Sequence, residues 1–156
     1  MSDFADLKVL IDQIRNNPTN LNLYLERGII WFEFKCYDEC VSDLFFYESN
    51  GGTDPVYMKY LGMALGKTTS KRSLEYLKKY ADSNESDMDA LVYLADSYFD
   101  NGDYQSSAIM FHRAVDNGFN PGILREKASF LAGQKMYDEA GFFDPAFGKK
   151  KSIFRR

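Results

Sequence analysis

The feature that most constrains the fold is a residue pattern that recurs about every 33 positions. Each copy has glycine or alanine, followed three positions later by a large aromatic residue or leucine. The four copies are Gly28 with Trp31, Gly62 with Leu65, Ala95 with Tyr98, and Ala128 with Leu131. Self-similarity at this period is typical of stacked helical hairpins rather than of one globular core. Such stacks usually bind other proteins, so the pattern indicates an interaction module without identifying its partner.

The third copy, residues 88–120, shows the pattern most clearly. Its small and apolar residues recur at spacings of three, four and seven, which is the one-face pattern of a helix. They are Leu91, Leu94, Ala95 and Tyr98 in the first half and Tyr104, Ser107, Phe111 and Ala114 in the second. A turn signal, Asn101-Gly102-Asp103, separates the halves. Ala95 and Ser107 are small enough to let two helix backbones approach closely.

These residues resemble the tetratricopeptide repeat (TPR) over roughly residues 18–143. The other copies match at Tyr24, Gly28, Trp31, Tyr37, Cys40, Leu44 and Tyr47; at Leu61, Gly62, Leu65, Ser73, Leu77 and Tyr80; and at Ala128, Leu131, Tyr137 and Ala140. In the second copy, the second helix comes one residue early. The resemblance implies an all-α fold, a right-handed superhelical stack of antiparallel helix hairpins. In this family the first helix of each hairpin lines a concave groove.

The repeats and their punctuation predict one domain over residues 1–148. We expect repeats at about 21–54, 55–87, 88–120 and 121–144, with prolines at or near their junctions. Residues 2–17 carry apolar side chains at helical spacing and predict an N-terminal capping helix, because the end of a solenoid would otherwise expose its apolar face. Pro145 cannot lie inside a helix, so the last hairpin should have a short or irregular second helix.

Composition predicts a soluble, cytoplasmic protein. No apolar run is long enough to span a bilayer, and the acidic N-terminus lacks the pattern of a signal peptide. Cys36 and Cys40 lie four residues apart on or near a helix and therefore face the same way. A metal site needs further ligands, and none is near them in the sequence. We therefore interpret both as packing thiols rather than as metal or redox groups.

Catalytic constellations are absent from the sequence. The single histidine, His112, is expected to be a surface or boundary residue on a helix. Gly51-Gly52 joins two hairpins and lacks the lysine and hydroxyl partners of a phosphate-binding loop. We expect no enzymatic activity, no cofactor and no metal.

The TPR resemblance implies which residues line the groove. They are Leu25, Ile29 and Phe32 in the first copy; Lys59 and Met63 in the second; Asp89, Val92, Asp96, Phe99 and Asp100 in the third; and Arg125 in the fourth. The groove should be apolar at its N-terminal end and acidic further along. The apolar stripe of the first copy either contacts a partner or is covered by the N-terminal helix. The lysine, asparagine and arginine positions that hold a carboxylate in chaperone-binding relatives are not matched, so that subclass is not expected.

Charge is unevenly placed along the chain. Residues 149–156 contain Lys149, Lys150, Lys151, Arg155 and Arg156, together with Ile153 and Phe154 and no acidic residue. The rest of the chain has 14 basic against 23 acidic residues, a net charge near −9. Such a basic tail binds nucleic acid, an acidic lipid surface or an acidic protein patch, or it has no role. Its charge and apolar pair also complement the predicted groove, so the tail of the same or a neighbouring molecule is one candidate occupant.

Two function classes follow. The first is a non-catalytic protein–protein interaction module, an adaptor or chaperone that holds a peptide or helix of its partner in the groove. The alternative is a scaffold that associates with nucleic acid or an acidic membrane surface through the tail. Phosphate binding requires a positive surface, so the acidic body disfavours extended contact with nucleic acid. Either class is compatible with a homo-oligomer.

Overall fold

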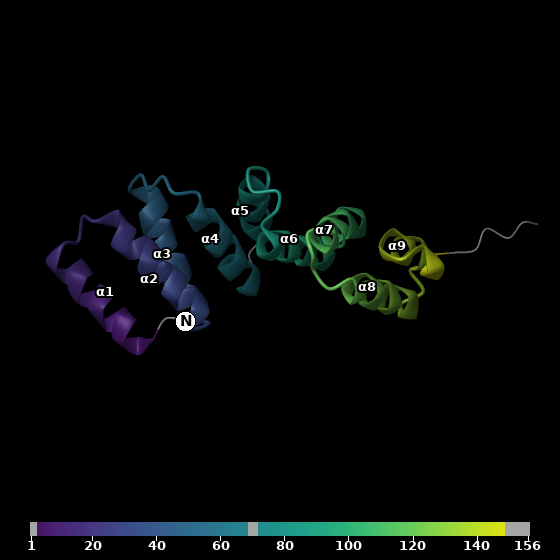
Figure 1. Ribbon diagram of the computed structural model, residues 1–156, viewed down its shortest axis with the longest axis horizontal. Coiled ribbons are helices and arrows are strands. Elements are labelled where there is room, and N and C mark those ends of the chain that lie inside the picture. Colours follow the sequence, from purple (N-terminus) through teal and green to yellow (C-terminus); the bar gives the residue numbers. More distant parts are fainter. Residues whose placement is uncertain (1–2, 69–71, 149–156) are drawn as a thin grey trace, which may run out of the picture. The chain divides into compact units, whose positions relative to one another are not determined.

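The computed structural model describes residues 3–68 and 72–148, and within these residues every regular element is helical. The α-helices are α1 (Phe4–Asn16), α2 (Leu21–Glu33), α3 (Tyr37–Ser49), α4 (Val56–Lys67), α5 (Arg72–Ala81), α6 (Met88–Asp100), α7 (Tyr104–Asp116), α8 (Gly122–Gly133) and α9 (Tyr137–Phe143). A short 3-10 helix, η1 (Pro145–Phe147), follows α9. Figure 1 shows these elements along the chain. The predicted all-α fold is confirmed.

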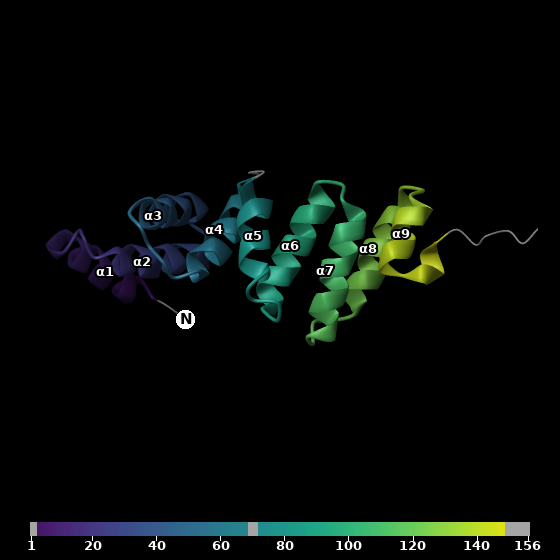
Figure 2. The same ribbon diagram turned by 90° about the horizontal axis from the view of Figure 1, so that it is seen from above.

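The chain divides into two compact units, residues 1–84 and 85–156. Unit 1 holds the hairpins α2/α3 and α4/α5, with α1 packed against α2 (Figure 1). Unit 2 holds the hairpins α6/α7 and α8/α9, and Figure 2 shows the two helices of each hairpin side by side. Consecutive helices therefore pair within each unit, as the repeats predict.

Small residues bring the two helices of a hairpin together. A Cβ atom added to Gly28 would lie 2.7 Å from Leu44 Cδ2, and one added to Gly62 would lie 2.7 Å from Leu77 Cγ. In α6/α7, the Ser107 hydroxyl donates a hydrogen bond of 2.8 Å to the carbonyl oxygen of Ala95. Close approach at the recurring small residue is thus the physical basis of the repeat pattern.

Acidic and amide side chains begin several helices. Asp3 caps α1, accepting hydrogen bonds from the backbone N–H groups of Ala5 and Asp6. Asp87 caps α6 in the same way, and Asp103 caps α7. These side chains satisfy N–H groups that have no partner inside the helix. The local sequence therefore sets where these helices start.

The end of the described chain also follows a sequence prediction. Helix α9 has seven residues and ends at Phe143. Asp144 then accepts a hydrogen bond from the backbone N–H of Ala146, which begins the 3-10 turn that contains Pro145. The last hairpin accordingly has the short second helix expected from Pro145.

Candidate functional site

The apolar stripe predicted on α2 is divided between the core and the surface of unit 1. Leu25 is only 7% exposed and belongs to the core formed with α3 and α4. Met63, predicted to line the groove from α4, is 4% exposed. These two side chains offer almost no surface to a partner, so they cannot serve as groove contacts in this structure. Ile29 and Lys59 remain partly exposed.

Phe32 packs against other rings of unit 1. Its ring centroid lies 5.6 Å from that of Tyr37 and 5.5 Å from that of Tyr60 on α4. It is partly buried against the same core as Leu25. Phe32 therefore connects α2 to α4, and only part of its surface is available to another molecule.

Helix α1 covers a different side of α2 from the one considered in the sequence analysis. Leu7 and Leu10 form a small core with Ile30, and Phe34 packs against it. The rings of Phe4 and Phe34 stack with their centroids 4.9 Å apart. The capping helix is thus present and buries the Ile30 side of α2, which leaves Ile29 at the edge of the covered surface.

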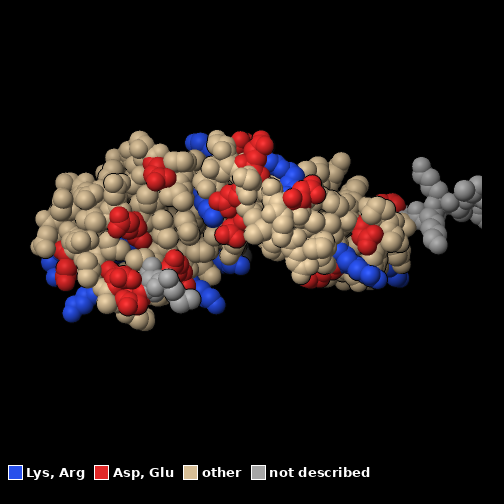
Figure 3. Space-filling model, in the orientation of Figure 1, with Lys and Arg blue, Asp and Glu red and all other residues tan. Residues whose placement is uncertain are grey.

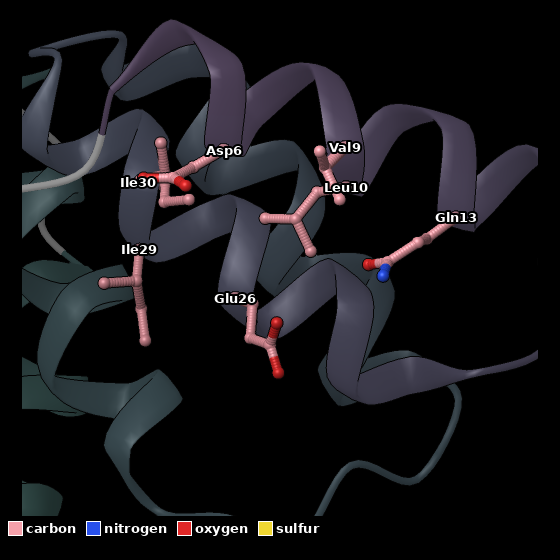
Figure 4. A pocket seen from close by; sticks show the side chains of 7 residues that line it. All are labelled: Asp6, Val9, Leu10, Gln13, Glu26, Ile29 and Ile30. Carbon is pink, nitrogen blue, oxygen red and sulfur yellow. The ribbon is translucent and has the colours of Figure 1, made fainter.

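A hollow of about 440 Å³ lies between α1 and α2 at this edge. Its lining comes from Asp6, Val9, Leu10 and Gln13 of α1 and from Glu26, Ile29 and Ile30 of α2. Figure 4 shows Leu10 and Gln13 reaching toward α2, with Glu26 and Ile29 projecting from α2 below them. Of the predicted groove residues, only Ile29 lines this hollow.

The hollow combines apolar walls with negative charge. Val9, Leu10, Ile29 and Ile30 supply the apolar surface, while the charged residues among its lining are Asp6 and Glu26. Figure 3 shows acidic side chains in separate groups across the visible face of unit 1, the part that carries α1 to α4 in Figure 1. Among the described residues that line the hollow, none is a lysine or an arginine. Chemically, the site suits an apolar side chain next to a cation.

In unit 2, one of the predicted acidic groove residues is already paired. Lys127 Nζ lies 2.7 Å from Asp96 Oδ1. The Lys127 side chain is only 18% exposed. The same ammonium group lies 4.5 Å from the centroid of the Phe99 ring. Asp96 therefore neutralises a cation of its own unit. Asp96 was predicted to line an acidic part of the groove, but its charge is balanced by Lys127.

The remaining predicted residues of unit 2 differ in exposure. Asp89, Asp100 and Arg125 are exposed, whereas Val92 and Phe99 are partly buried against the core of this unit. The Phe99 ring also contacts Phe130, with centroids 5.8 Å apart. Phe130 is 57% exposed and is not one of the predicted groove residues.

A hydrogen-bonded network in unit 1 has a structural role. Both Tyr57 and Tyr76 donate to the carboxylate of Glu48, at 3.1 and 2.8 Å, which ties α4 and α5 to α3. Burial, and then the hydrogen bond to Glu48, raises the pKa of Tyr57 to about 12. The same causes raise the pKa of Tyr76.

The cysteines and the histidine lie apart from the hollow. Cys40 is fully buried, and burial followed by the charge of Asp43 raises the pKa of its thiol to about 12. Cys36 is half-buried. Within the described residues, no group of three or more His, Cys, Asp and Glu side chains is placed to hold a metal ion. His112 is exposed, with Nε2 3.3 Å from the carbonyl oxygen of Phe142.

In the part of the chain that the structure describes, none of the helices has the length and apolar character needed to cross a membrane. The predicted tail residues Lys149, Lys150, Lys151, Phe154, Arg155 and Arg156 lie outside the described residues.

Comparison with known proteins addresses the fold. No protein-family model and no curated protein matches the chain. Among solved structures, MamA matches with a TM-score of 0.72 and 16% identity over 94% of each chain. MamA from Desulfovibrio magneticus RS-1 gives a TM-score of 0.74 and 14% identity over 92% of this chain and 82% of that one. YrrB, described as a TPR protein with an unusual peptide-binding site, gives 0.71 and 17% over 90% and 77%. The chain therefore has a TPR-like repeat fold.

Proposed function

We propose that the protein is a non-catalytic interaction module that binds a peptide or helix of a partner protein in the hollow between α1 and α2. The observation that carries the proposal is the hollow itself, which combines apolar walls with two carboxylates. Its volume of about 440 Å³ lies within the range of about 300–1,000 Å³ typical of ligand sites. A few polar groups beside an apolar surface give such a site orientation as well as affinity.

The similar structures support this class of function. YrrB is a TPR protein with a peptide-binding site, and it shares the fold over most of this chain. We infer by analogy that this protein is an adaptor or chaperone acting in the cytoplasm. Its binding surface extends from the hollow along the partly exposed side chains of Ile29, Phe32 and Lys59 in unit 1.

Selection of peptides on the intact protein tests the proposal. A random peptide library is selected against the full chain, and the binding of the enriched peptides is measured by calorimetry. We expect sequences with an apolar residue next to lysine or arginine. Val9 is 54% exposed, so Val9→Lys should leave the fold intact while placing a cation in the apolar wall, where it repels the basic residue of the peptide. We expect it to weaken binding at least about tenfold, which corresponds to about 1.4 kcal/mol.

The matched control is Ile109→Lys, because Ile109 is a similarly exposed apolar residue, at 51%, on α7 of unit 2. The control variant should bind the selected peptides like the unmodified chain. Equal weakening by both substitutions, or binding unaffected by either, would place the peptide site elsewhere and contradict the proposal.

A further inference from the structure

Three helices end at an asparagine followed by a glycine. The pairs are Asn50-Gly51 after α3, Asn101-Gly102 after α6 and Asn117-Gly118 after α7. Each asparagine is the C-cap of its helix, and the three glycines take the left-handed conformation, with φ of 88°, 79° and 100°. The backbone N–H of the residue after each glycine donates a hydrogen bond to a carbonyl oxygen in the last turn of the helix, which is the Schellman ending. The same ending therefore occurs once in unit 1 and twice in unit 2.

An asparagine that precedes glycine has a chemical route to modification. The glycine nitrogen attacks the side-chain carbonyl carbon Cγ of the asparagine, which closes a succinimide ring. The bond from Cγ to Nδ2 breaks, and the amide leaves as ammonia with the proton that the glycine nitrogen gives up. Water then opens the ring and leaves aspartate or isoaspartate. Glycine favours the attack because it has no Cβ atom to obstruct the approach and its backbone rotates freely.

The backbone of each folded turn opposes this attack. The ψ angles of the three asparagines are 12°, 0° and 9°. A ψ near zero turns the glycine nitrogen toward the backbone nitrogen of the asparagine, whereas the ring closes only when the glycine nitrogen lies beside Cβ. The glycine N–H groups also donate hydrogen bonds of 2.9–3.1 Å to backbone carbonyl oxygens. The reaction therefore requires a rotation about the Cα–C bond that takes the glycine out of its hydrogen-bonded turn.

The leaving amide is held in the folded turn as well. Nδ2 of Asn50, Asn101 and Asn117 donates to the carbonyl oxygen of the fourth residue before it, at 2.8, 2.7 and 3.0 Å. All three asparagines are exposed, so water reaches each turn once it opens. We propose that Asn50, Asn101 and Asn117 are deamidation sites, each of which reacts only when the end of its own helix opens. This inference goes beyond the proposed function and does not depend on what the hollow binds.

The product should loosen the helix end that protects the site. An aspartate in place of Asn101 has no N–H group to donate to Ser97, and its negative charge lies at the negative end of the helix dipole. Asn101→Asp should therefore lower the urea midpoint more than Asn101→Ala does, because the alanine loses the hydrogen bond without adding a charge. An Asp variant as stable as the Ala variant would overturn this part of the proposal.

Mass spectrometry of the full chain tests the sites themselves. The folded chain and the chain unfolded in guanidinium are incubated at mildly alkaline pH, and each asparagine is scored for the loss of ammonia and the gain of water. We expect the three sites to react at least about tenfold more slowly in the folded chain, which corresponds to an opening free energy of about 1.4 kcal/mol. A short peptide with one asparagine–glycine pair, incubated in both solvents, corrects for the effect of guanidinium on the chemistry.

Two results would contradict the proposal. Equal corrected rates in the folded and unfolded chains would show that the helix ends do not protect the asparagines. An unfolded chain that stays unmodified at these positions would show that they are not deamidation sites. Asn22 is the internal control, because it is exposed and precedes leucine, and it should react much more slowly than the three sites in the unfolded chain.

A variant that loosens one helix end tests whether the protection is local. Phe119 follows Gly118, is partly buried, and donates its backbone N–H to the carbonyl oxygen of Ala114 at 2.9 Å. An apolar contact of this residue commonly accompanies a Schellman ending. Phe119→Ser removes the partly buried ring, so we expect Asn117 to be modified several-fold faster in the folded variant.

The control for this variant is Ile109→Ser, because Ile109 lies on the same helix and is 51% exposed. It should leave the rates at all three sites unchanged. In the Phe119→Ser chain, Asn101 should react at its original rate, because it ends a different helix of unit 2. An unchanged rate at Asn117, or equal acceleration at Asn101 and Asn117, would overturn the proposal, since modification would then not follow the opening of a single helix end.

Discussion

The hairpins α2/α3 and α6/α7 are built from helices of the same length, thirteen residues each, but different residues hold them together. In α6/α7, Phe111 is fully buried in the core, and Ser107 donates a hydrogen bond to Ala95. In α2/α3, the corresponding large residue is Leu44, which packs directly on Gly28. The comparison shows that Gly28, which is smaller than Ala95, lets α3 approach α2 closely even though Leu44 is smaller than Phe111.

The turns of the two hairpins differ more than their cores. In α6/α7, Gly102 takes the left-handed backbone conformation with φ of 79°, and Asp103 caps α7. In α2/α3, Lys35 takes this conformation with φ of 61°, and Cys36 stands at the cap position without a side-chain hydrogen bond. The first hairpin thus forms with unfavourable local chemistry.

Contacts within unit 1 compensate for that turn. The Arg27 guanidinium makes two hydrogen bonds of 2.7 Å to the carboxylate of Asp43, which joins α2 to α3. The hydrogen bond to Asp43 raises the pKa of Arg27. Helix α1 adds a second layer of packing on α2. Tertiary contacts therefore stabilise the first hairpin, whereas local signals specify the third.

The largest predicted effects come from the two core side chains. Phe111→Ala should lower the free energy of unfolding by about 3–5 kcal/mol and Leu44→Ala by about 2–5 kcal/mol, because both residues are fully buried and leave a cavity. The only tryptophan, Trp31, lies in α2 of unit 1, so its fluorescence follows that unit, while circular dichroism follows all helices.

The probes separate the two hairpins. We expect Leu44→Ala to lower the denaturant midpoint seen by fluorescence, and Phe111→Ala to lower the midpoint seen by circular dichroism. Ile109→Ala is the control for α7, since Ile109 is exposed and its truncation should change stability by less than about 0.5 kcal/mol. A Phe111→Ala chain as stable as the Ile109→Ala chain would show that the core of unit 2 is misplaced.

The next effect comes from filling the close contacts. Ala95 is fully buried, so Ala95→Leu should overpack the α6/α7 contact and cost about 1–3 kcal/mol. Gly28→Ala should also destabilise, because its new Cβ atom would lie 2.7 Å from Leu44 Cδ2. The higher helix propensity of alanine offsets up to about 1 kcal/mol of that loss.

A control glycine and a double variant test whether the contact with Leu44 causes the loss of stability in Gly28→Ala. Gly133→Ala, at a glycine with nothing within 4 Å of the added Cβ, should not destabilise the fold. Adding Gly28→Ala to a Leu44→Ala chain should cost less than adding it to the unmodified chain, because the clashing side chain is gone. Additive losses in denaturation experiments would show that the contact between Gly28 and Leu44 is not the cause.

The sequence predicted the hairpins because packing positions such as Gly28 and Ala95 recur at a fixed period, which makes them visible without a structure. It could not predict the hollow, which depends on how α1 settles on Ile30 of α2 and not on the repeat. The contact between Asp96 and Lys127 was missed for a related reason, since it joins two residues that lie 31 positions apart, in neighbouring hairpins. Features repeated along the chain were therefore predictable, and features formed by one particular pair of elements were not.

Transferring a cap from one hairpin to the other should have a smaller, favourable effect. Cys36→Asp places at the start of α3 the residue type that caps α7 in the third hairpin. A new side-chain cap is expected to raise the free energy of unfolding by about 0.5–2 kcal/mol. Cys36→Ala is the control, because it removes the thiol without supplying an acceptor. Equal stability of the Asp and Ala variants in urea denaturation would show that the α3 terminus cannot use a cap.

Replacing the left-handed Lys35 by glycine should raise the free energy of unfolding by up to about 1.5 kcal/mol. A residue with a Cβ atom costs roughly 1–2 kcal/mol in this conformation, and the greater flexibility of glycine in the unfolded chain takes back about 0.5–1 kcal/mol. We therefore expect Lys35→Gly to be stabilising, and Lys135→Gly as well, since Lys135 has φ of 63°. The reverse change, Gly102→Ala, should destabilise α6/α7 by a similar amount. A stabilising Gly102→Ala in thermal unfolding would contradict the assigned backbone.

The smallest effect on stability at neutral pH comes from the Cys40 thiol. Cys40 lies in the second helix of the first hairpin, where the third hairpin has Ser107. Burial raises the pKa of the Cys40 thiol to about 12, above the value of about 8.5 for an exposed cysteine. The folded state thus favours the protonated thiol, and its contribution to stability is complete below about pH 8.5 and is lost as the pH rises toward 12. In a Cys36→Ser chain, the remaining thiol should resist a disulfide reagent at pH 8 until denaturant is added. If the native chain were modified as rapidly as the unfolded chain, Cys40 would have to lie at the surface. It would then be a reactive cysteine and not a packing residue.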